Sequence, residues 1–307
     1  MALAPRFGIF LVPAAGDPRE PFRAVKIADD NGLDLLFVQD HPYQPRFYET
    51  WTLLTALAMA TSRIYVSTGV ADLPLRLPSV LAKQAATLDA LTGGRVELGL
   101  GAGRYWDEIT AFGGPKRSPA EAYAAFADAL HIVRGMWDCA GDEFTYQGKV
   151  YTVDGARPGP APAHRIPIWV GATGPRMLRL TGRMADGLFG SFDFFPPEQQ
   201  QKVHALVDQG AREAGRSPEM IRRGNNIHGV IRPGRGSASF AAQAGATDGT
   251  AGYWTERLTS LYLESRQDTF VFWANGDVAQ QVEVFAKEVV PAVKDRVATL
   301  RQLLRLC

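Results

Sequence analysis

His41 is the residue of this chain whose chemistry is best suited to moving a proton. It follows Asp40 directly, just past the apolar segment Leu35–Val38, which predicts a buried strand. A histidine can donate or accept a proton near neutral pH, and a neighbouring aspartate can orient its ring. In the alternative interpretation, His41 hydrogen-bonds only to the backbone and Asp40 caps a loop turn. The pair therefore predicts either a catalytic acid–base site or a structural turn.

A glycine-rich segment, AATLDALTGGRVELGLGAG (85–103), predicts a place where a ligand approaches the backbone closely. Its first half has apolar residues at helical spacing and ends at a glycine pair beginning at Gly93, because glycine adopts the positive φ of a helix end. Val96–Gly101 then predicts a strand. Gly101 and Gly103 leave the backbone open where that strand ends.

Arg104 follows these glycines and offers a positive charge at the same strand end. It could hold a phosphate or a substrate anion, or it could form an ordinary surface ion pair. Tyr105 and Trp106 come next and could either wall a pocket or pack beneath a helix. The segment therefore predicts an anion contact without identifying the anion.

A second loop of small residues joins the predicted strand Ile168–Val170 to a helix. Its residues are Gly171, Ala172, Thr173, Gly174, Pro175 and Arg176. Pro175 suits the first turn of a helix, where free backbone N–H groups attract anions. Thr173 adds a hydroxyl and Arg176 a positive charge. The loop predicts a phosphate cradle, with an ordinary barrel loop as the alternative.

These residues must be positioned by the elements around them, and the chain contains eight predicted strand-then-helix units. The strands are short and apolar, which suits a parallel sheet covered on both faces. They are Phe7–Val12, Leu35–Val38, Ile64–Val70, Val96–Gly101, Ile168–Val170, Gly187–Phe189, Ile227–Ile231 and Thr269–Phe272. Helices are expected at about 18–31, 51–61, 78–91, 120–137, from 174 onward, 197–214, 254–264 and 278–289. The alternation predicts an α/β fold, a (β/α)8 TIM barrel with its functional residues at the carboxyl ends of the strands.

Two insertions in the strand-end loops, about 141–167 and 232–252, interrupt the alternation. In the first, residues 144–152 predict a small hairpin, and four prolines in 158–167 predict a stiff connection. The second is rich in Gly, Ala, Ser and Thr, which is typical of a lid over the barrel mouth or of a disordered segment, and we favour the lid. All of residues 1–307 are expected to form a single barrel domain.

Composition restricts the partners and the location of the protein. The chain has 307 residues with 33 Lys and Arg against 32 Asp and Glu, so it offers no electrostatic attraction for nucleic acid or an anionic membrane. No segment is long and apolar enough to span a bilayer. The two cysteines, Cys139 and Cys307, are too far apart to suggest a disulfide framework, and the five histidines show no metal-ligand pair at short spacing. We expect a cytoplasmic protein that acts on a small molecule without a metal.

Motifs along nearly the whole chain resemble those of the luciferase-like flavin- and deazaflavin-dependent oxidoreductases, a (β/α)8 barrel family. The motifs are Asp40-His41-Pro42, Thr68-Gly69-Val70, Leu75-Arg76-Leu77-Pro78, Ala86-Thr87-Leu88-Asp89 with Gly93-Gly94-Arg95, the segment 98–103, Glu108, Gly113-Gly114, the segment 169–176, Ala185-Asp186-Gly187, Phe285-Ala286 and Val289-Val290-Pro291. The resemblance implies that His41 contacts the redox ring or the substrate and that the cofactor's phosphate lies near the loop 171–176.

The resemblance also implies a set of cofactor-binding residues. These are His41, Gly69, Val70, Ala71, Gly101, Gly103, Arg104, Gly171, Ala172, Thr173, Gly174, Pro175 and Arg176. In the family the bond corresponding to Gly69–Val70 is often a non-proline cis peptide that forms a bulge behind the ring. We therefore predict a cis peptide bond between Gly69 and Val70.

The Asp-His pair and the helix end Leu-Asp-x-Leu-x-Gly-Gly-Arg look closer to the coenzyme F420 branch than to the FMN branch. With F420, the protein would transfer a hydride to or from a C=C, C=N or C=O group, while His41 supplies or removes the proton. With FMN, it would be a monooxygenase that uses reduced flavin and O2. A flavin-binding barrel without turnover is the third hypothesis. Family members are commonly homodimers, so we expect a homodimer.

Two departures from the family argue against a sugar-phosphate substrate. The family's sugar-phosphate dehydrogenases have a tryptophan shortly after the loop histidine, where this chain has Pro45-Arg46-Phe47. They also have an acidic residue directly after the glycines of the fourth strand, where this chain has Arg104. Both changes leave hydride transfer open but leave its substrate unidentified.

Overall fold

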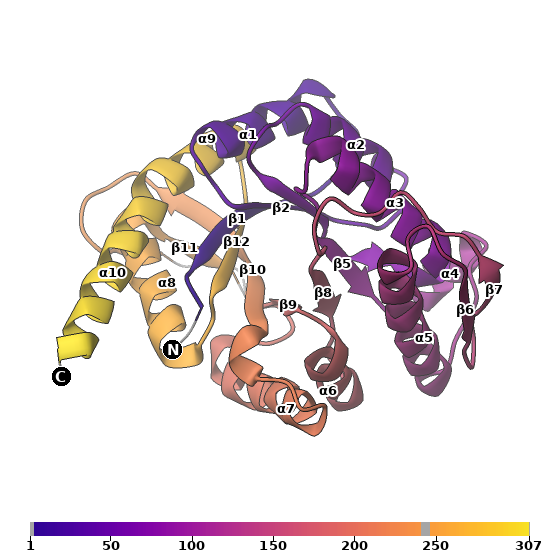
Figure 1. Ribbon diagram of the computed structural model, residues 1–307. Helices are drawn as coiled ribbons and strands as arrows, with labels where there is room; N and C mark the ends of the chain where they lie inside the picture. The colour runs from indigo at the N-terminus through magenta and orange to yellow at the C-terminus, as the bar shows by residue number, and fades with distance from the viewer. Residues whose placement is uncertain (1–2, 241–245, 307) are drawn as a thin grey trace.

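The computed structural model describes residues 3–240 and 246–306, and its centre is a barrel of parallel strands ringed by helices (Figure 1). The order around the barrel is β3-β2-β1-β12-β10-β9-β8-β5-β4, with parallel pairing throughout. These strands are β1 (Arg6–Leu11), β2 (Leu35–Val38), β3 (Tyr65–Thr68), β4 (Ala71–Asp72), β5 (Leu98–Gly101), β8 (Ile168–Gly171), β9 (Gly187–Ser191), β10 (Arg222–Arg232) and β12 (Thr269–Ala274). The predicted (β/α)8 barrel is confirmed.

The third strand of the barrel is divided into β3 and β4 at a bulge. The peptide bond between Gly69 and Val70 is cis, as predicted. Before the bulge, Val66 forms a parallel bridge with Val96, and the Glu97 N–H donates to the Val66 carbonyl at 2.9 Å. After the bulge, β4 pairs with β5, so the two halves of this strand together close the ring.

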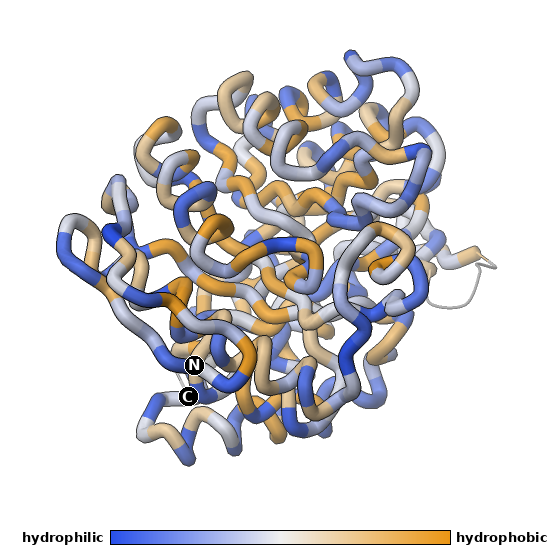
Figure 2. The backbone as a smooth tube through the Cα atoms, turned by 90° about the vertical axis from the view of Figure 1, so that its right-hand side faces the viewer, coloured by the Kyte–Doolittle hydropathy of each residue, from blue (hydrophilic) through white to orange (hydrophobic). Residues whose placement is uncertain are grey.

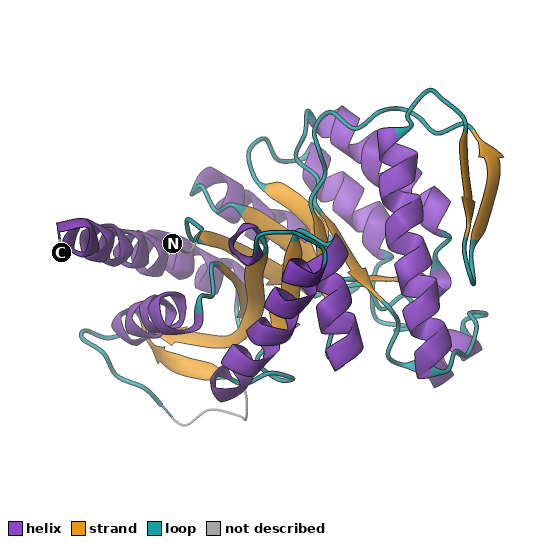
Figure 3. Ribbon diagram, turned by 60° about the horizontal axis from the view of Figure 1, so that its bottom comes forward, coloured by secondary structure: helices purple, strands orange, loops and turns teal. Residues whose placement is uncertain are grey.

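Helices cover the outside of the barrel (Figures 1 and 3). They are α1 (Arg19–Asp30), α2 (Thr50–Met59), α3 (Pro78–Thr92), α4 (Trp106–Ala111), α5 (Pro119–Asp138), α6 (Pro175–Met184), α7 (Gln200–Glu213), α8 (Ala251–Ser265), α9 (Val278–Val284) and α10 (Val290–Leu306). Short 3-10 segments lie at Leu73–Leu75, Pro197–Gln199 and Pro218–Met220, and a π-helical turn at Phe285–Val289.

Local signals explain where several helices begin and end. The α3 helix ends at Gly93, whose φ of 68° is left-handed as expected. The α5 helix begins with a capping box between Ser118 and Glu121.

The α4 and α10 helices were not predicted. Pro291 comes just after the π-helical turn Phe285–Val289, and the helical segment continues through it into α10.

The two insertions differ in outcome. The first contains the expected hairpin, β6 (Phe144–Gln147) paired antiparallel with β7 (Thr152–Ala156), which stands outside the helices (Figure 3). The second insertion is not a lid over its whole length. Its residues Thr247–Thr250 form the buried strand β11, which pairs in parallel with the end of β10, and the Thr250 side chain caps α8. Residues 241–245 lie outside the described part of the chain.

Hydrophobic residues are frequent along the central segments of the chain (Figure 2). Their side chains form two clusters, one between barrel and helices and one inside the barrel. The inner cluster takes alternate strand residues, because successive side chains of a strand face opposite ways. It consists of Phe10, Leu35, Phe37, Trp169, Phe189 and Val271. The Phe37 and Phe189 rings stack with centroids 4.2 Å apart, so the barrel interior is filled and can serve as the floor of a site. In the described residues, no helix has the length and apolarity to cross a membrane.

Candidate active site

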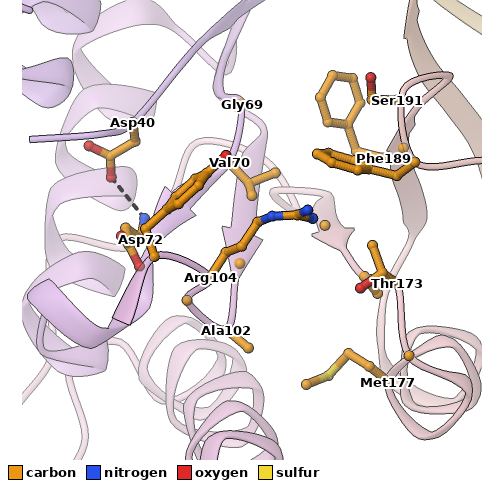
Figure 4. A pocket seen from close by; sticks show the side chains of 18 of the residues that line it. Asp40, Gly69, Val70, Asp72, Ala102, Arg104, Thr173, Met177, Phe189 and Ser191 are labelled. Carbon is orange, nitrogen blue, oxygen red and sulfur yellow. Dashed lines mark hydrogen bonds between the residues drawn. The ribbon is translucent and has the colours of Figure 1, made fainter. Parts of the chain in front are cut away.

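A cavity of about 680 Å³ lies at the carboxyl ends of the barrel strands, and Figure 4 shows part of its lining. Its volume falls within the usual range for small-molecule sites. Every site residue predicted from the sequence lines it: Asp40, His41, Gly69, Val70, Ala71, Gly101, Gly103, Arg104, Gly171, Ala172, Thr173, Gly174, Pro175 and Arg176. The fold thus brings together loops that follow four different strands.

Glycines on neighbouring strands make room for Val70 in the wall of the cavity. A Cβ atom added at Gly101 or at Gly171 would lie 2.8 Å from Val70 Cγ2, which is too close for carbon atoms. A Cβ at Gly69 would lie 2.9 Å from the Phe10 ring. These positions therefore require glycine, and together they fix the position of Val70 against the sheet.

His41 lies half-buried at the end of β2 and contacts two tyrosines. Its Nδ1 is 2.6 Å from the Tyr43 hydroxyl, and its ring packs edge-on against Tyr105. Burial lowers the pKa of His41, and the negative charge of Asp40 only partly offsets this. The imidazole is therefore neutral at neutral pH. Because Nδ1 is engaged by Tyr43, Nε2 is the ring nitrogen available to a ligand.

Asp40 does not orient His41 through a hydrogen bond, contrary to one expectation from the sequence. Its Oδ2 accepts from the Asp72 backbone N–H and from Arg76 Nε, both at 2.9 Å, and its Oδ1 accepts from Arg76 at 2.7 Å. Arg76 also contacts Glu49 at 2.9 Å. Asp40 thus holds β4 and the following segment in place and affects His41 only through its charge.

Asp72 is a functional candidate that sequence reasoning missed. Its side chain lines the cavity yet is only 6% exposed, and its Oδ1 has no hydrogen-bond partner in the described part of the chain. Burial raises the pKa of Asp72 to about 7, and the charge of Asp40 adds to the rise, while Arg76 and the Tyr43 hydroxyl oppose it. Its position two residues beyond the Gly69–Val70 motif was the signal available in the sequence.

The loop 171–176 provides the opposite side of the cavity. The α6 helix begins after Gly174 with Pro175 in its first turn and no side-chain cap, so its N-terminal N–H groups are left for another acceptor. Thr173 is exposed beside them, and Arg176 lies over the Tyr123 ring at 4.4 Å. This arrangement can hold an anion.

Arg104 stacks on an aromatic side chain across the cavity mouth. Its guanidinium lies 4.0 Å from the centroid of the Phe194 ring, which belongs to the loop after β9. The charge is thereby held at the cavity, where it can meet an anionic ligand. Further lining residues that the sequence did not indicate lie on β9, β10 and β12 or in their loops: Phe189, Ser191, Asp193, Phe195, Asn226 and Trp273.

Two other expectations concern lids and metals. No described residue of the insertion 232–252 lines the cavity, so that part of the chain does not cover it. Among the residues described, no three His, Cys, Asp or Glu side chains gather closely enough to hold a metal ion. The polar groups of the cavity are instead suited to an organic ligand with an anionic end.

A family model described as luciferase-like monooxygenase matches residues 3–289 of this chain. The chain is 31% identical over 230 residues to F420-dependent glucose-6-phosphate dehydrogenase of Microbacterium testaceum, covering 72% of this chain and 67% of that protein. It is 31% identical over 216 residues to 5,10-methylenetetrahydromethanopterin reductase of Methanolobus tindarius, covering 70% and 62%. The matched regions thus cover about two thirds of the length of the first relative and slightly less of the second.

Solved structures with low sequence identity share the fold. An F420-dependent secondary alcohol dehydrogenase in complex with an F420-acetone adduct superimposes with a TM-score of 0.83 at 20% identity, over 95% of this chain and 99% of that chain. The coenzyme F420-dependent tetrahydromethanopterin reductase from Methanopyrus kandleri gives 0.80 at 20% identity, over 94% and 99%. An EDTA monooxygenase from Chelativorans gives 0.77 at 14% identity, over 96% and 94%.

Proposed function

The chain belongs to the luciferase-like monooxygenase family, and we propose that it is an oxidoreductase that uses coenzyme F420 to transfer a hydride to or from a small organic molecule. The observation that carries the proposal is the cavity at the strand ends, with an anion-binding loop on one side and His41 on the other. The names of the relatives favour F420 over FMN.

The residues present fit such a cofactor. Val70 offers an apolar wall of the kind that a flat ring needs. The absence of a Cβ at Gly101 and at Gly171 leaves the space that the Val70 side chain occupies. The uncapped start of α6 with Thr173, together with the charge of Arg104, offers donors for an anionic tail. When bound, the deazaflavin would supply or accept the hydride.

The chain's own residues would position the substrate and handle the proton. His41 is neutral at neutral pH, so only one of its ring nitrogens carries a proton. With the proton on Nδ1, which then donates to the Tyr43 hydroxyl, Nε2 could take a proton from an alcohol; with the proton on Nε2 and Nδ1 accepting from Tyr43, Nε2 could give its proton to a carbonyl oxygen. The aromatic floor of Phe10, Phe189 and Trp273 would exclude water from the reacting atoms. We assign these side chains binding and proton transfer, and leave the electron chemistry to the cofactor.

The substrate is proposed to be a small molecule with a C=C, C=N or C=O group, or the corresponding reduced form. We do not assign glucose 6-phosphate to this chain, because Arg104 and the segment Pro45-Arg46-Phe47 replace residues found in the sugar-phosphate dehydrogenases of the family. We further propose a homodimer in the cytoplasm. Sedimentation analysis of the purified protein tests the dimer.

Titration of the purified protein with F420 and, separately, with FMN tests the cofactor assignment through fluorescence quenching. We expect saturable binding of F420 that is weakened by Thr173→Ala combined with Arg104→Ala. Binding of FMN alone would replace the proposal with a flavin monooxygenase. Binding of neither would refute both enzymatic assignments, and binding of F420 without turnover on any acceptor would favour a barrel that only binds the cofactor.

A further inference from the structure

The cavity has two chemically different sides. Figure 4 shows Asp72 on one side and Thr173 with Met177 on the other, with Val70 and Arg104 between them. The Thr173 side offers helix N–H groups and nearby arginines to an anion. The Asp72 side offers a carboxyl group. A ligand that fills both sides would therefore be favoured if it is negative at the Thr173 end and positive at the Asp72 end.

The Asp72 carboxyl has no cation of its own. The backbone N–H of Asp72 donates to Asp40 (Figure 4), and Asp72 lines the cavity. Arg76, whose charge acts on Asp72, is paired with Asp40 and with Glu49. Within the described residues, Asp72 Oδ1 is buried without any hydrogen-bond partner. A buried carboxyl oxygen in this position costs free energy unless a ligand provides a donor.

The surroundings of Asp72 are aromatic and acidic. The rings of Tyr43 and Tyr105 lie 6.2 Å apart. Burial raises the pKa of Tyr43, and the negative charges of Asp72, Glu108 and Asp40 raise it further. Tyrosine rings attract cations through their electron-rich faces. The other titratable group facing this corner, His41, is neutral because burial lowers its pKa. Two arginines are near this corner in the described part of the chain, and neither forms an ion pair with Asp72. Arg76 pairs with Asp40 and Glu49, and Arg104 lies over the Tyr105 ring at 5.9 Å and the Phe194 ring at 4.0 Å.

We propose that Asp72 binds a basic nitrogen of the substrate, so that this site acts on an amine or an imine. The inference rests on the function proposed above and identifies the substrate class of the same cavity. An ammonium or iminium group would give Asp72 Oδ1 its missing donor in a charge-assisted hydrogen bond. In the oxidative direction the ammonium would first pass its proton to the Asp72 carboxylate, because only the neutral amine can lose an α-hydride; in the reductive direction the iminium carbon would gain the hydride and leave a neutral amine. An alcohol or a ketone of the same shape carries no charge, so it would form no ion pair with Asp72.

The protonation of Asp72 provides an independent signature of this contact. Because its pKa is raised to about 7, Asp72 is mostly protonated at pH 6 in the absence of a cation. A cationic ligand favours the carboxylate, so binding at pH 6 must release a proton from Asp72. At pH 8.5 the carboxyl is already ionised, and the release should disappear.

Calorimetry on the F420-loaded protein tests the proposal with benzylamine and benzyl alcohol as size-matched probes. At pH 8 we expect benzylamine to bind at least about tenfold more tightly than benzyl alcohol. Asp72→Asn should abolish this preference while leaving F420 affinity unchanged. Asp107→Asn, which removes an exposed carboxylate near the cavity but outside its lining, should keep the preference.

A second measurement needs no variant. Benzylamine binding at pH 6, repeated in two buffers with different ionisation enthalpies, should show release of a fraction of a proton up to one, and none at pH 8.5. Equal affinities for the two probes, or a preference that persists in Asp72→Asn, would overturn the proposal. So would a loss of F420 affinity in Asp72→Asn, because it would assign the carboxyl to the cofactor. Failure of F420 to bind either protein would instead refute the proposed function, and the probe preference can still be measured without it.

Discussion

The buried carboxyl groups at the two ends of the barrel differ in their partners. At the amino ends of the strands, three buried acids each contact an arginine: Glu97 with Arg6 at 2.7 Å, Asp268 with Arg222 at 3.0 Å and Asp208 with Arg223 at 2.5 Å. Two others, Asp29 and Asp89, instead accept backbone N–H groups just ahead of β3 and β5. At the carboxyl ends, Asp40 forms an ion pair with Arg76, and Asp72, beside the cavity, has no ion pair in the described part of the chain.

This difference in pairing assigns the buried acids of the amino end to stability and the unpaired acid of the carboxyl end to ligand binding. Removing one partner of a buried ion pair is costly because it leaves the other charge without a partner, so the amino end of the barrel depends on its pairs for stability. An acid left unpaired at the carboxyl end destabilises the free protein but is available to a ligand. This division matches the general rule that barrel enzymes place their sites at the carboxyl ends of the strands.

The largest effect is expected at the amino end. Asp208→Ala leaves the guanidinium of Arg223, whose side chain is 1% exposed, buried without its carboxylate. We expect the free energy of unfolding to fall by about 3–5 kcal/mol, measured by urea denaturation. Asp107→Ala, which breaks an exposed pair with Lys116, is the control and should change stability by less than about 0.5 kcal/mol. Equal effects of the two substitutions would remove the distinction between the two ends.

His41→Ala tests whether the carboxyl end of the barrel carries the catalytic proton-transfer group. Because it removes the proton-transfer group, we expect turnover to fall on the order of 10²-fold, while F420 affinity stays within about tenfold and unfolding changes by less than about 1 kcal/mol. The assay uses a substrate found by screening acceptors with reduced F420. His131→Ala, on the exposed face of α5, should keep full turnover. Unchanged turnover in His41→Ala would exclude His41 from the mechanism.

The pH dependence of stability tests whether Asp72 is unpaired. Its pKa is raised from 3.8 to about 7, so the folded state keeps a proton that the unfolded chain has lost. The contribution of protonated Asp72 to the free energy of unfolding is complete below about pH 4 and is lost as pH rises through 7. Between pH 5 and pH 8, we expect wild type to lose about 2 kcal/mol relative to Asp72→Asn, since water in the cavity offsets part of the full shift. A constant difference would mean that Asp72 has an ordinary pKa.

The smallest effect is expected from crowding Val70. Gly171→Ala would place a Cβ 2.8 Å from Val70 Cγ2 and displace the wall that faces the ring, so F420 affinity should fall about tenfold. Gly16→Ala, where an added Cβ meets no atom within 4 Å, is the matched control. Fluorescence titration measures both, and equal affinities would show that Val70 does not define the ring site.

Much of the fold and of the binding loops could be predicted because the signals are local. Apolar periodicity located the barrel strands, and glycine at positions such as Gly93 marked helix ends. The loop 171–176 contains its own signal for a helix start, Pro175 in the first turn of α6. The helix α10 and the strand β11 escaped prediction, because tertiary packing decided them against weak or misleading local signals.

The polar side of the cavity could not be predicted in the same way. Asp40 and Arg76 are 36 residues apart, and nothing in their spacing shows that this arginine pairs with Asp40 instead of Asp72. The sequence alone determined the barrel, the position of His41 at a strand end and the glycines around Val70, since these follow from periodicity and from residue size. Only the tertiary structure decided which buried carboxyl remains unpaired, because a charge partner is chosen by distance in space and by burial.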